Sequence, residues 1–253
     1  MVKAFCKYYL SRKTAAAVSN KFVSDLNSHV LSKISEIRDE DIQSLVNKLK
    51  KDKALVEIED FGAGSKKTTS NSRTVSSIVN SAAISPKYGK MLSLLCSHFN
   101  CQTIIELGTS LGIGSYYLSL GDPNSLIHTI EGCKNISDIA QKNLNKNTNV
   151  KCYVGEFSSK LEEVLLNSGK PDLVYIDGNH TQKATVDYYN FFIKNANSKA
   201  ILVFDDIHWS SGMEMAWEQI IASSSSRITI DLFRMGIVFL DPNLKKEHFF
   251  LKF

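Results

Sequence analysis

The sequence lacks any apolar run that approaches the roughly 18 residues of a membrane-spanning helix. The stretch from Met1 to Lys21 also lacks the continuous apolar segment of a secretory leader. We therefore expect no membrane partner and a place in the cytoplasm. The 5 cysteines form no CxxC pair and are odd in number, which argues against a disulfide framework and against a zinc site.

A broad basic stripe with interleaved aromatic residues is also missing, so we expect no nucleic-acid partner. The net charge of +4 comes from 30 basic and 26 acidic residues spread along the chain. The densest lysine group, from Lys48 to Lys53, is typical of a solvated helix C-terminus. With 43% apolar and 22% charged residues, the chain of 253 residues has the composition of an ordinary globular protein of one or two domains.

The first part of the chain, residues 1–82, is mostly helical in pattern. Apolar residues recur at helical spacing over residues 22–34 and again over residues 42–49. A short apolar piece, residues 54–58, leads into the segment DFGAGS at residues 60–65 and then into a polar loop. That segment is either an ordinary turn or part of a loop that closes over a site. We expect the whole N-terminal region to act as a lid or as a dimer element.

From Thr103 onward the pattern changes to alternating strands and helices. The predicted strands are residues 103–107, 125–131, 150–154, 172–177 and 200–205. The predicted helices between them lie around residues 116–120, 136–144, 161–166, 181–193 and 213–222. A further helix is expected before the first strand, over residues 86–98, with Ser85 as its N-cap and Pro86 at its first position.

Apolar strands separated by helices indicate βαβ units and a parallel sheet that is covered on both faces. The tail differs, because the predicted strands 228–233, 236–240 and 248–253 have no helices between them. We therefore expect the sheet to end in antiparallel pairing. The predicted fold is α/β: a doubly wound, Rossmann-like, mostly parallel sheet with antiparallel C-terminal strands, preceded by a helical N-terminal region.

The first strand of the sheet ends in a glycine-rich turn preceded by a carboxylate. The residues expected to bind a cofactor there are Glu106, Gly108, Thr109, Ser110, Gly112 and Gly114. Glycines let the backbone pass close to a ligand, and the next helix offers free N–H groups. The spacing GxxxGxG differs from the GxGxxG of dinucleotide sites. A carboxylate beside the turn disfavours a pyrophosphate and favours a cationic sulfonium ligand with an ammonium group. The alternative is a tight turn without a ligand.

Acidic residues also follow the second and third strands. Glu131 can accept hydrogen bonds from both hydroxyls of a ribose, as an acidic residue does in dinucleotide folds; the alternative is a surface glutamate. Glu156 and Phe157 could meet the edge and face of an adenine, although a packing role fits them nearly as well.

Four segments together carry a resemblance to a known family. The runs IIELGTSLGIGSYYLS, YIDGNHT and LVFDDIHWSSGMEMAW, with the acidic end of the second strand, resemble class I S-adenosylmethionine-dependent methyltransferases, and bacterial enzymes with an O-methyltransferase-like domain in particular. The resemblance covers about residues 83–253. It implies a domain that binds S-adenosyl-L-methionine through Glu106, Gly108, Gly112 and Glu131. It also implies that a small-molecule acceptor approaches over the ends of the fourth and fifth strands.

Those strand ends carry Asp177, His180, Asp205 and Asp206. Three converging carboxylates would suit Mg²⁺ or another divalent cation. The resemblance to cation-dependent O-methyltransferases of the catechol kind points to Asp177, Asp205 and Asp206, with aspartate at position 206 where asparagine is usual. The alternative is that Asp205 and Asp206 only cap the next helix and orient the loop.

His180 lies where catechol-type enzymes carry a lysine base, and a histidine can take that role near neutral pH. A structural, hydrogen-bonded histidine is the alternative. Asp177 is the second candidate base, and it also lies where it can touch the cofactor.

The sequence therefore predicts transfer of a methyl group to an acceptor oxygen, with nitrogen second. A nicotinamide-dependent oxidoreductase and a non-catalytic cofactor-binding or interaction module are the alternatives. Because enzymes of this kind often pair, a homodimer is also expected.

Overall fold

The computed structural model describes residues 2–58 and 72–253, with side chains from Phe5 onward. The DFGAGS segment and most of the polar loop after it lie outside the described residues. None of the described helices is both long enough and apolar enough to span a membrane.

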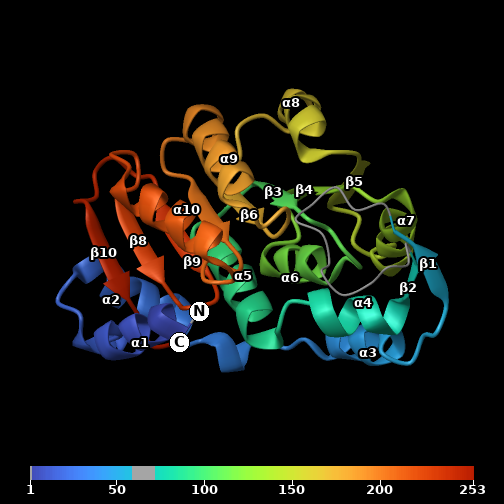
Figure 1. The fold of residues 1–253 in the computed structure, drawn as a ribbon, viewed down its shortest axis with the longest axis horizontal. Coiled ribbons are helices and arrows are strands. Elements are labelled where there is room, and N and C mark those ends of the chain that lie inside the picture. Colours follow the sequence, from blue (N-terminus) through green and yellow to red (C-terminus); the bar gives the residue numbers. More distant parts are fainter. Residues whose placement is uncertain (1, 59–71) are drawn as a thin grey trace.

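The fold is built on an eight-stranded sheet with the order β10-β8-β9-β7-β6-β3-β4-β5 (Figure 1). Its strands are β3 Thr103–Leu107, β4 Leu126–Glu131, β5 Val150–Val154, β6 Leu173–Ile176, β7 Ile201–Phe204, β8 Ile228–Asp231, β9 Gly236–Phe239 and β10 Glu247–Phe250. The strands β3 to β7 pair in parallel, which confirms the predicted doubly wound sheet.

The prediction for the tail is correct for β9 and wrong for β10. Strand β9 runs antiparallel to both β7 and β8, whereas β10 pairs in parallel with β8, with Glu247 opposite Ile228. The reason is topological. Strand β9 ends where β8 begins, and the chain then passes to the outer edge of β8, so β10 starts at the same end of the sheet as its neighbour.

Helices cover both faces of the sheet, in two hydrophobic clusters separated by the strands. One face carries α5 Pro86–His98, α6 Ile113–Gly121 and α7 Lys134–Asn143; the other carries α8 Phe157–Ser168, α9 Gln182–Asn195 and α10 Ser211–Ala222. Successive side chains of a strand point to opposite faces, so Ile104 joins the first cluster and Ile105 the second. Pro86 begins α5 as expected, although the side chain of Ser85 makes no capping hydrogen bond.

The N-terminal region is more broken than its periodicity predicts. Its elements are α1 Val2–Ser11, a 3₁₀ turn Ala15–Ala17, α2 Lys21–Leu26, a π turn Asn27–Leu31, a 3₁₀ turn Ile34–Glu36, α3 Glu40–Leu49, β1 Leu55–Glu57, β2 Ser72–Thr74 and α4 Val75–Ala82. The single helix expected over residues 22–34 gives way to a π turn. There the side chains of Ser28 and His29 both bond the backbone carbonyl of Asp25, where side-chain bonds can compete with the helical pattern.

The N-terminal region packs closely on the sheet. Val23, Leu26 and Ile42 belong to the same buried cluster as residues of the strands. The hydroxyl of Tyr8 donates to the carbonyl of Leu251 at 2.6 Å, so α1 is fastened beside the end of β10 (Figure 1). The division of the chain after residue 82 stays a prediction.

Candidate functional site

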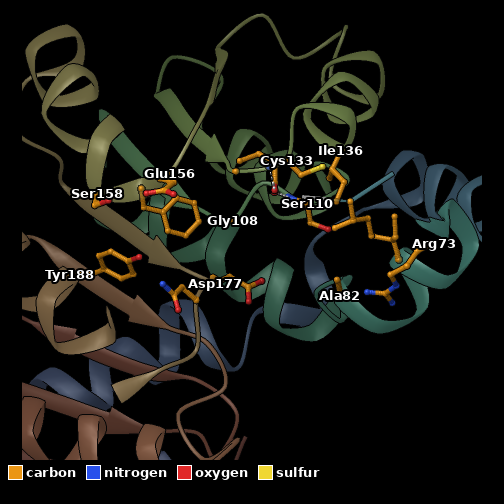
Figure 2. A pocket seen from close by; sticks show the side chains of 17 residues that line it. Arg73, Ala82, Gly108, Ser110, Cys133, Ile136, Glu156, Ser158, Asp177 and Tyr188 are labelled. Atoms are coloured by element: carbon orange, nitrogen blue, oxygen red, sulfur yellow. Dashed lines mark hydrogen bonds between the residues drawn. The ribbon is translucent and has the colours of Figure 1, made fainter. Parts of the chain in front are cut away.

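A cavity of about 340 Å³ opens at the carboxyl ends of the central strands (Figure 2). Its volume lies in the range of about 300–1,000 Å³ that is typical of small-molecule sites. Of the residues predicted from the sequence, it is lined by Gly108, Ser110, Glu131, Glu156, Phe157 and Asp177. The ends of β3, β4, β5 and β6 thus bring together residues that lie far apart in the chain.

The floor of the cavity depends on close contact between two turns. Gly108 has φ +102°, and a Cβ built on it would collide with the backbone carbonyl of Asp177. A Cβ on Gly178 would lie 2.7 Å from the ring of Phe157. The chain can pass this close only because both positions carry hydrogen in place of a side chain.

Glu106 lies behind this turn and has no exposed surface. Its Oε2 accepts hydrogen bonds from Ser115 and, at 2.6 Å, from Thr129, whereas Oε1 is buried without a hydrogen-bond partner. Burial raises the pKa of Glu106 to about 8, although the two hydroxyl donors lower it. A buried carboxylate oxygen without a partner favours a nearby positive charge.

Glu106 also lines a small space beside the main cavity. A second cavity, of about 10 Å³, is lined by Glu106, Thr109 and Gly114 and shares Gly108, Ser110, Ala82 and Asp177 with the first. A Cβ on Gly114 would collide with Oε1 of Glu106, so glycine keeps this space open. The residues therefore fit a ligand that places a cationic group near Glu106.

Two residues of the predicted turn act mainly within the protein. Gly112 lines neither cavity; it has φ +85° and occupies the N-cap position of α6, where glycine is favoured. The hydroxyl of Thr109 is buried against that of Thr129 at 2.5 Å. That contact continues the hydrogen-bonded chain that ends at Oε2 of Glu106.

Glu131 is held firmly at the wall of the cavity. Its Oε2 accepts from the backbone N–H of Ser110 at 2.8 Å, and its Oε1 accepts from that of Cys133 at 3.0 Å. Burial raises the pKa of Glu131, against the lowering effect of these backbone donors. Each carboxylate oxygen keeps a second lone pair, so the group can also accept from two ligand hydroxyls.

The end of the cavity near Glu156 is partly aromatic. The ring centroids of Phe157 and Tyr188 lie 5.8 Å apart in an edge-to-face arrangement. Figure 2 shows Tyr188 facing the cavity on the same side as Glu156. Flat apolar walls beside a carboxylate suit a heteroaromatic ring.

Several lining residues were not predicted from the sequence. They are Ile58, Arg73, Ile78, Ala82, Gly132, Cys133, Ile136, Ser158, Gly178 and Tyr188. Helix α4 contributes Ile78 and Ala82, and its apolar residues follow the spacing i, i+3, i+4, i+7 from Val75. That periodicity could have revealed the helix, but nothing in it indicates which ligand the helix faces.

Asp177 connects the cavity to the candidate base. Its Oδ1 lies 3.5 Å from Nε2 of His180, and its Oδ2 accepts from the hydroxyl of Tyr175 at 3.0 Å. Burial alone would lower the pKa of His180, but the carboxylates of Asp177, Asp206 and Asp205 raise it above its usual value. The structure therefore brings together the two predicted catalytic residues.

The predicted cation site does not fit the observed contacts. Asp205 is paired through both of its oxygens with Arg234, at 2.9 and 2.8 Å. Among the described residues, no three His, Cys, Asp or Glu side chains are grouped so that they could hold a metal ion. Arg234 lies in the turn between β8 and β9 and is not among the residues predicted from the sequence.

Comparisons with known proteins find methyltransferases. Residues 105–207 match the family described as "Methyltransferase domain". The chain is 28% identical over 135 residues to a catechol O-methyltransferase of Mycobacterium tuberculosis, a match that covers 52% of this chain and 60% of that protein. The chain thus spans about three fifths of the length of this curated relative.

Solved structures of methyltransferases share the fold. An O-methyltransferase from Bacillus cereus in complex with SAH has a TM-score of 0.58 at 16% identity, covering 85% of this chain and 99% of its own. The O-methyltransferase TomG from Streptomyces achromogenes, in complex with SAM, has a TM-score of 0.54 at 20% identity, covering 63% of this chain and 82% of its own.

Proposed function

We propose that this chain, which carries a class I methyltransferase domain, is an S-adenosylmethionine-dependent O-methyltransferase that acts on a small-molecule acceptor. The proposal depends above all on two carboxylates at the glycine-rich turn. Glu106 keeps a buried oxygen without a partner behind the turn, and Glu131 is fixed at the cavity wall in front of it.

Different residues of the cavity would contact different parts of such a cofactor. Glu106 would attract its cationic amino-acid end, Glu131 would accept hydrogen bonds from the ribose, and Phe157 with Tyr188 would flank the adenine. S-Adenosylmethionine, when bound, supplies an activated methyl group on a sulfonium. The matched family and the cofactor complexes of similar folds support this assignment.

The protein's part in the reaction is to align the acceptor and to remove its proton. Asp177 lines the cavity, and the imidazole of His180 lies beside its carboxylate. In its neutral form His180 takes the proton of the acceptor hydroxyl, and Asp177 stabilises the imidazolium that forms. Alignment of the acceptor oxygen with the reacting carbon supplies much of the remaining rate enhancement. No divalent cation enters this scheme.

The N-terminal region would help to enclose the cofactor. Helix α4 forms one wall of the cavity through Ile78 and Ala82, so this region serves as part of the cofactor enclosure. The predicted homodimer can be tested by analytical ultracentrifugation, which measures the mass of the protein in solution. Catechols are the first acceptors to try, since the curated relative carries that name.

Calorimetry with S-adenosylhomocysteine tests the proposal. The wild-type protein should bind this product with micromolar affinity, and Glu131→Ala should weaken binding about tenfold to a hundredfold because charge-assisted hydrogen bonds are lost. Glu162→Ala, on the exposed side of α8, is the matched control and should bind normally. Failure of the folded wild-type protein to bind at millimolar ligand would contradict the proposal. Binding of a nicotinamide cofactor instead would favour an oxidoreductase, and binding without transfer to any acceptor would favour a non-catalytic module.

A further inference from the structure

The acceptor side of the site contains a cation that belongs to the protein itself. Arg234 follows Phe233, whose φ of +70° turns the chain between β8 and β9. Its Nε donates to Oδ1 of Asp205 at 2.9 Å and its Nη2 donates to Oδ2 at 2.8 Å. This two-pronged pairing is the strongest geometry available to an arginine and a carboxylate. Asp205 is 1% exposed, so the carboxylate end of the pair is shielded from water, whereas the Arg234 side chain is 34% exposed.

The remaining lone pairs of Asp205 also face protein donors. The backbone N–H of Asp206 donates to Oδ1 at 2.8 Å, and the hydroxyl of Tyr175 approaches Oδ2 at 3.4 Å. A carboxylate offers about four acceptor positions, two on each oxygen. Three of them accept from Arg234 and from the backbone N–H of Asp206, and the fourth faces the Tyr175 hydroxyl, which shares its single hydrogen with Asp177. A metal ion could coordinate Asp205 only by displacing one of these donors.

The same guanidinium also lies near a second carboxylate, that of Asp206. Nε of Arg234 lies 3.8 Å from Oδ1 of Asp206, a residue with a φ of +53°. The ring of Tyr88 lies 6.0 Å below the guanidinium. Hydrogen bonding to Asp205, together with the charges of Asp205 and Asp206, raises the pKa of Arg234 despite its partial burial, so the guanidinium stays charged.

We infer that Arg234 is the resident cation beside Asp205 and Asp206, in the place where the sequence predicts a divalent ion, and that these carboxylates bind no divalent ion while Arg234 is present. The inference rests on the proposed function, because it concerns the acceptor side of the same site. Arg234 acts as a positioning residue. It neutralises Asp205, fixes the turn that carries Asp206, and keeps three of its five N–H donors for other acceptors.

A titration with Mn²⁺, followed by electron paramagnetic resonance, tests this assignment on the full chain. The wild-type protein, with and without S-adenosylhomocysteine, should leave the signal of free Mn²⁺ unchanged up to millimolar protein. Arg234→Met should gain Mn²⁺ binding by at least about tenfold, because removal of the guanidinium leaves neighbouring carboxylates without a counter-charge. Arg234→Lys keeps the charge and should behave like the wild type.

Arg227→Met is the matched control, because Arg227 lies at the opposite end of β8 and donates to the carbonyl of Leu244. It should gain no Mn²⁺ affinity. Stoichiometric Mn²⁺ binding by the wild-type protein would overturn the inference, and so would a folded Arg234→Met that binds no Mn²⁺. If Arg234→Met does not fold, the wild-type titration decides alone. Calorimetry with S-adenosylhomocysteine on the same samples separates this outcome from a failure of the proposed function, which would abolish cofactor binding instead.

Discussion

The backbone carbonyl of Asp177 lies where a side chain of Gly108 would stand. One residue belongs to the turn after β3 and the other to the turn after β6, so this contact sets the distance between the two turns that form the cavity floor. The geometry of the site therefore depends on a missing methyl group as much as on any charged side chain.

Gly108→Ala should destabilise the fold strongly. Its Cβ would collide with a backbone atom that cannot move without shifting β6, and its φ of +102° disfavours any L side chain. We expect a loss of about 3 kcal/mol or more in the free energy of unfolding, measured in urea. Gly169→Ala is the control, because its φ is also positive at +75° but no atom lies within 4 Å of its Cβ. Its φ and ψ of +75° and −165° alone should cost about 1–3 kcal/mol, less than the loss in Gly108→Ala; equal losses in the two variants would contradict the expectation.

Glu106→Gln should leave the protein folded and weaken its affinity for S-adenosylhomocysteine. The pKa of Glu106 is raised to about 8 by burial, so the carboxyl is mostly neutral at pH 7 before the ligand binds. The amide therefore replaces a neutral group at little cost to the fold, but it cannot become an anion beside the ligand's ammonium. We expect affinity to fall about tenfold to a hundredfold.

Ligand binding at pH 7 should release a proton from Glu106, because a nearby positive charge lowers the pKa of a carboxyl. Calorimetry in buffers with different ionisation enthalpies measures that proton. The wild-type enthalpy should depend on the buffer, and that of Glu106→Gln should depend on it less. Identical buffer dependence in both proteins would assign the proton to another group.

The stability of the ligand-free protein should fall as the pH rises from about 4.5 to 8. Glu106 has a folded pKa of about 8 against an ordinary value of 4.5, because burial penalises its charged form. Between these values the folded state holds a proton that the unfolded state has lost, so the stabilisation is complete below pH 4.5 and is lost as the pH passes 8. Urea unfolding across this range measures the slope. The difference between the wild type and Glu106→Gln isolates this carboxyl, and parallel curves would contradict the expectation.

His180 should titrate above the usual histidine value of 6.5, because the carboxylates of Asp177, Asp206 and Asp205 outweigh the effect of burial. Asp206→Asn should lower the pKa of His180, and Asp187→Asn, on the exposed side of α9, should not change it. NMR titration of the imidazole measures both shifts. With an acceptor that supports turnover, His180→Gln should slow methyl transfer by about 10²–10⁴-fold. Unchanged turnover in that variant would remove His180 from the mechanism.

The parallel sheet could be predicted from the sequence because its strands are continuous apolar runs that end in acidic or glycine residues. Glu106 and Glu131 could also be predicted as site residues, because a carboxylate at the end of an apolar strand contributes little to packing. The direction of β10 could not be predicted, because it depends on the route of the chain past β8 and not on local pattern.

Arg234 could not be found for a similar reason. It is separated from Asp205 by 29 positions, and only the pairing of β9 with β7 brings the two together. The break in the helix after Leu26 depends on side chains that bond the carbonyl of Asp25, which hydrophobic periodicity does not register.

The buried hydroxyl of Tyr175 faces two carboxylates, one after β6 and one after β7. Its single O–H faces Asp177 at 3.0 Å and Asp205 at 3.4 Å, and it can be donated fully to only one of them at a time. A change of charge at Asp177 would therefore alter the hydrogen bond that this hydroxyl can give to Asp205.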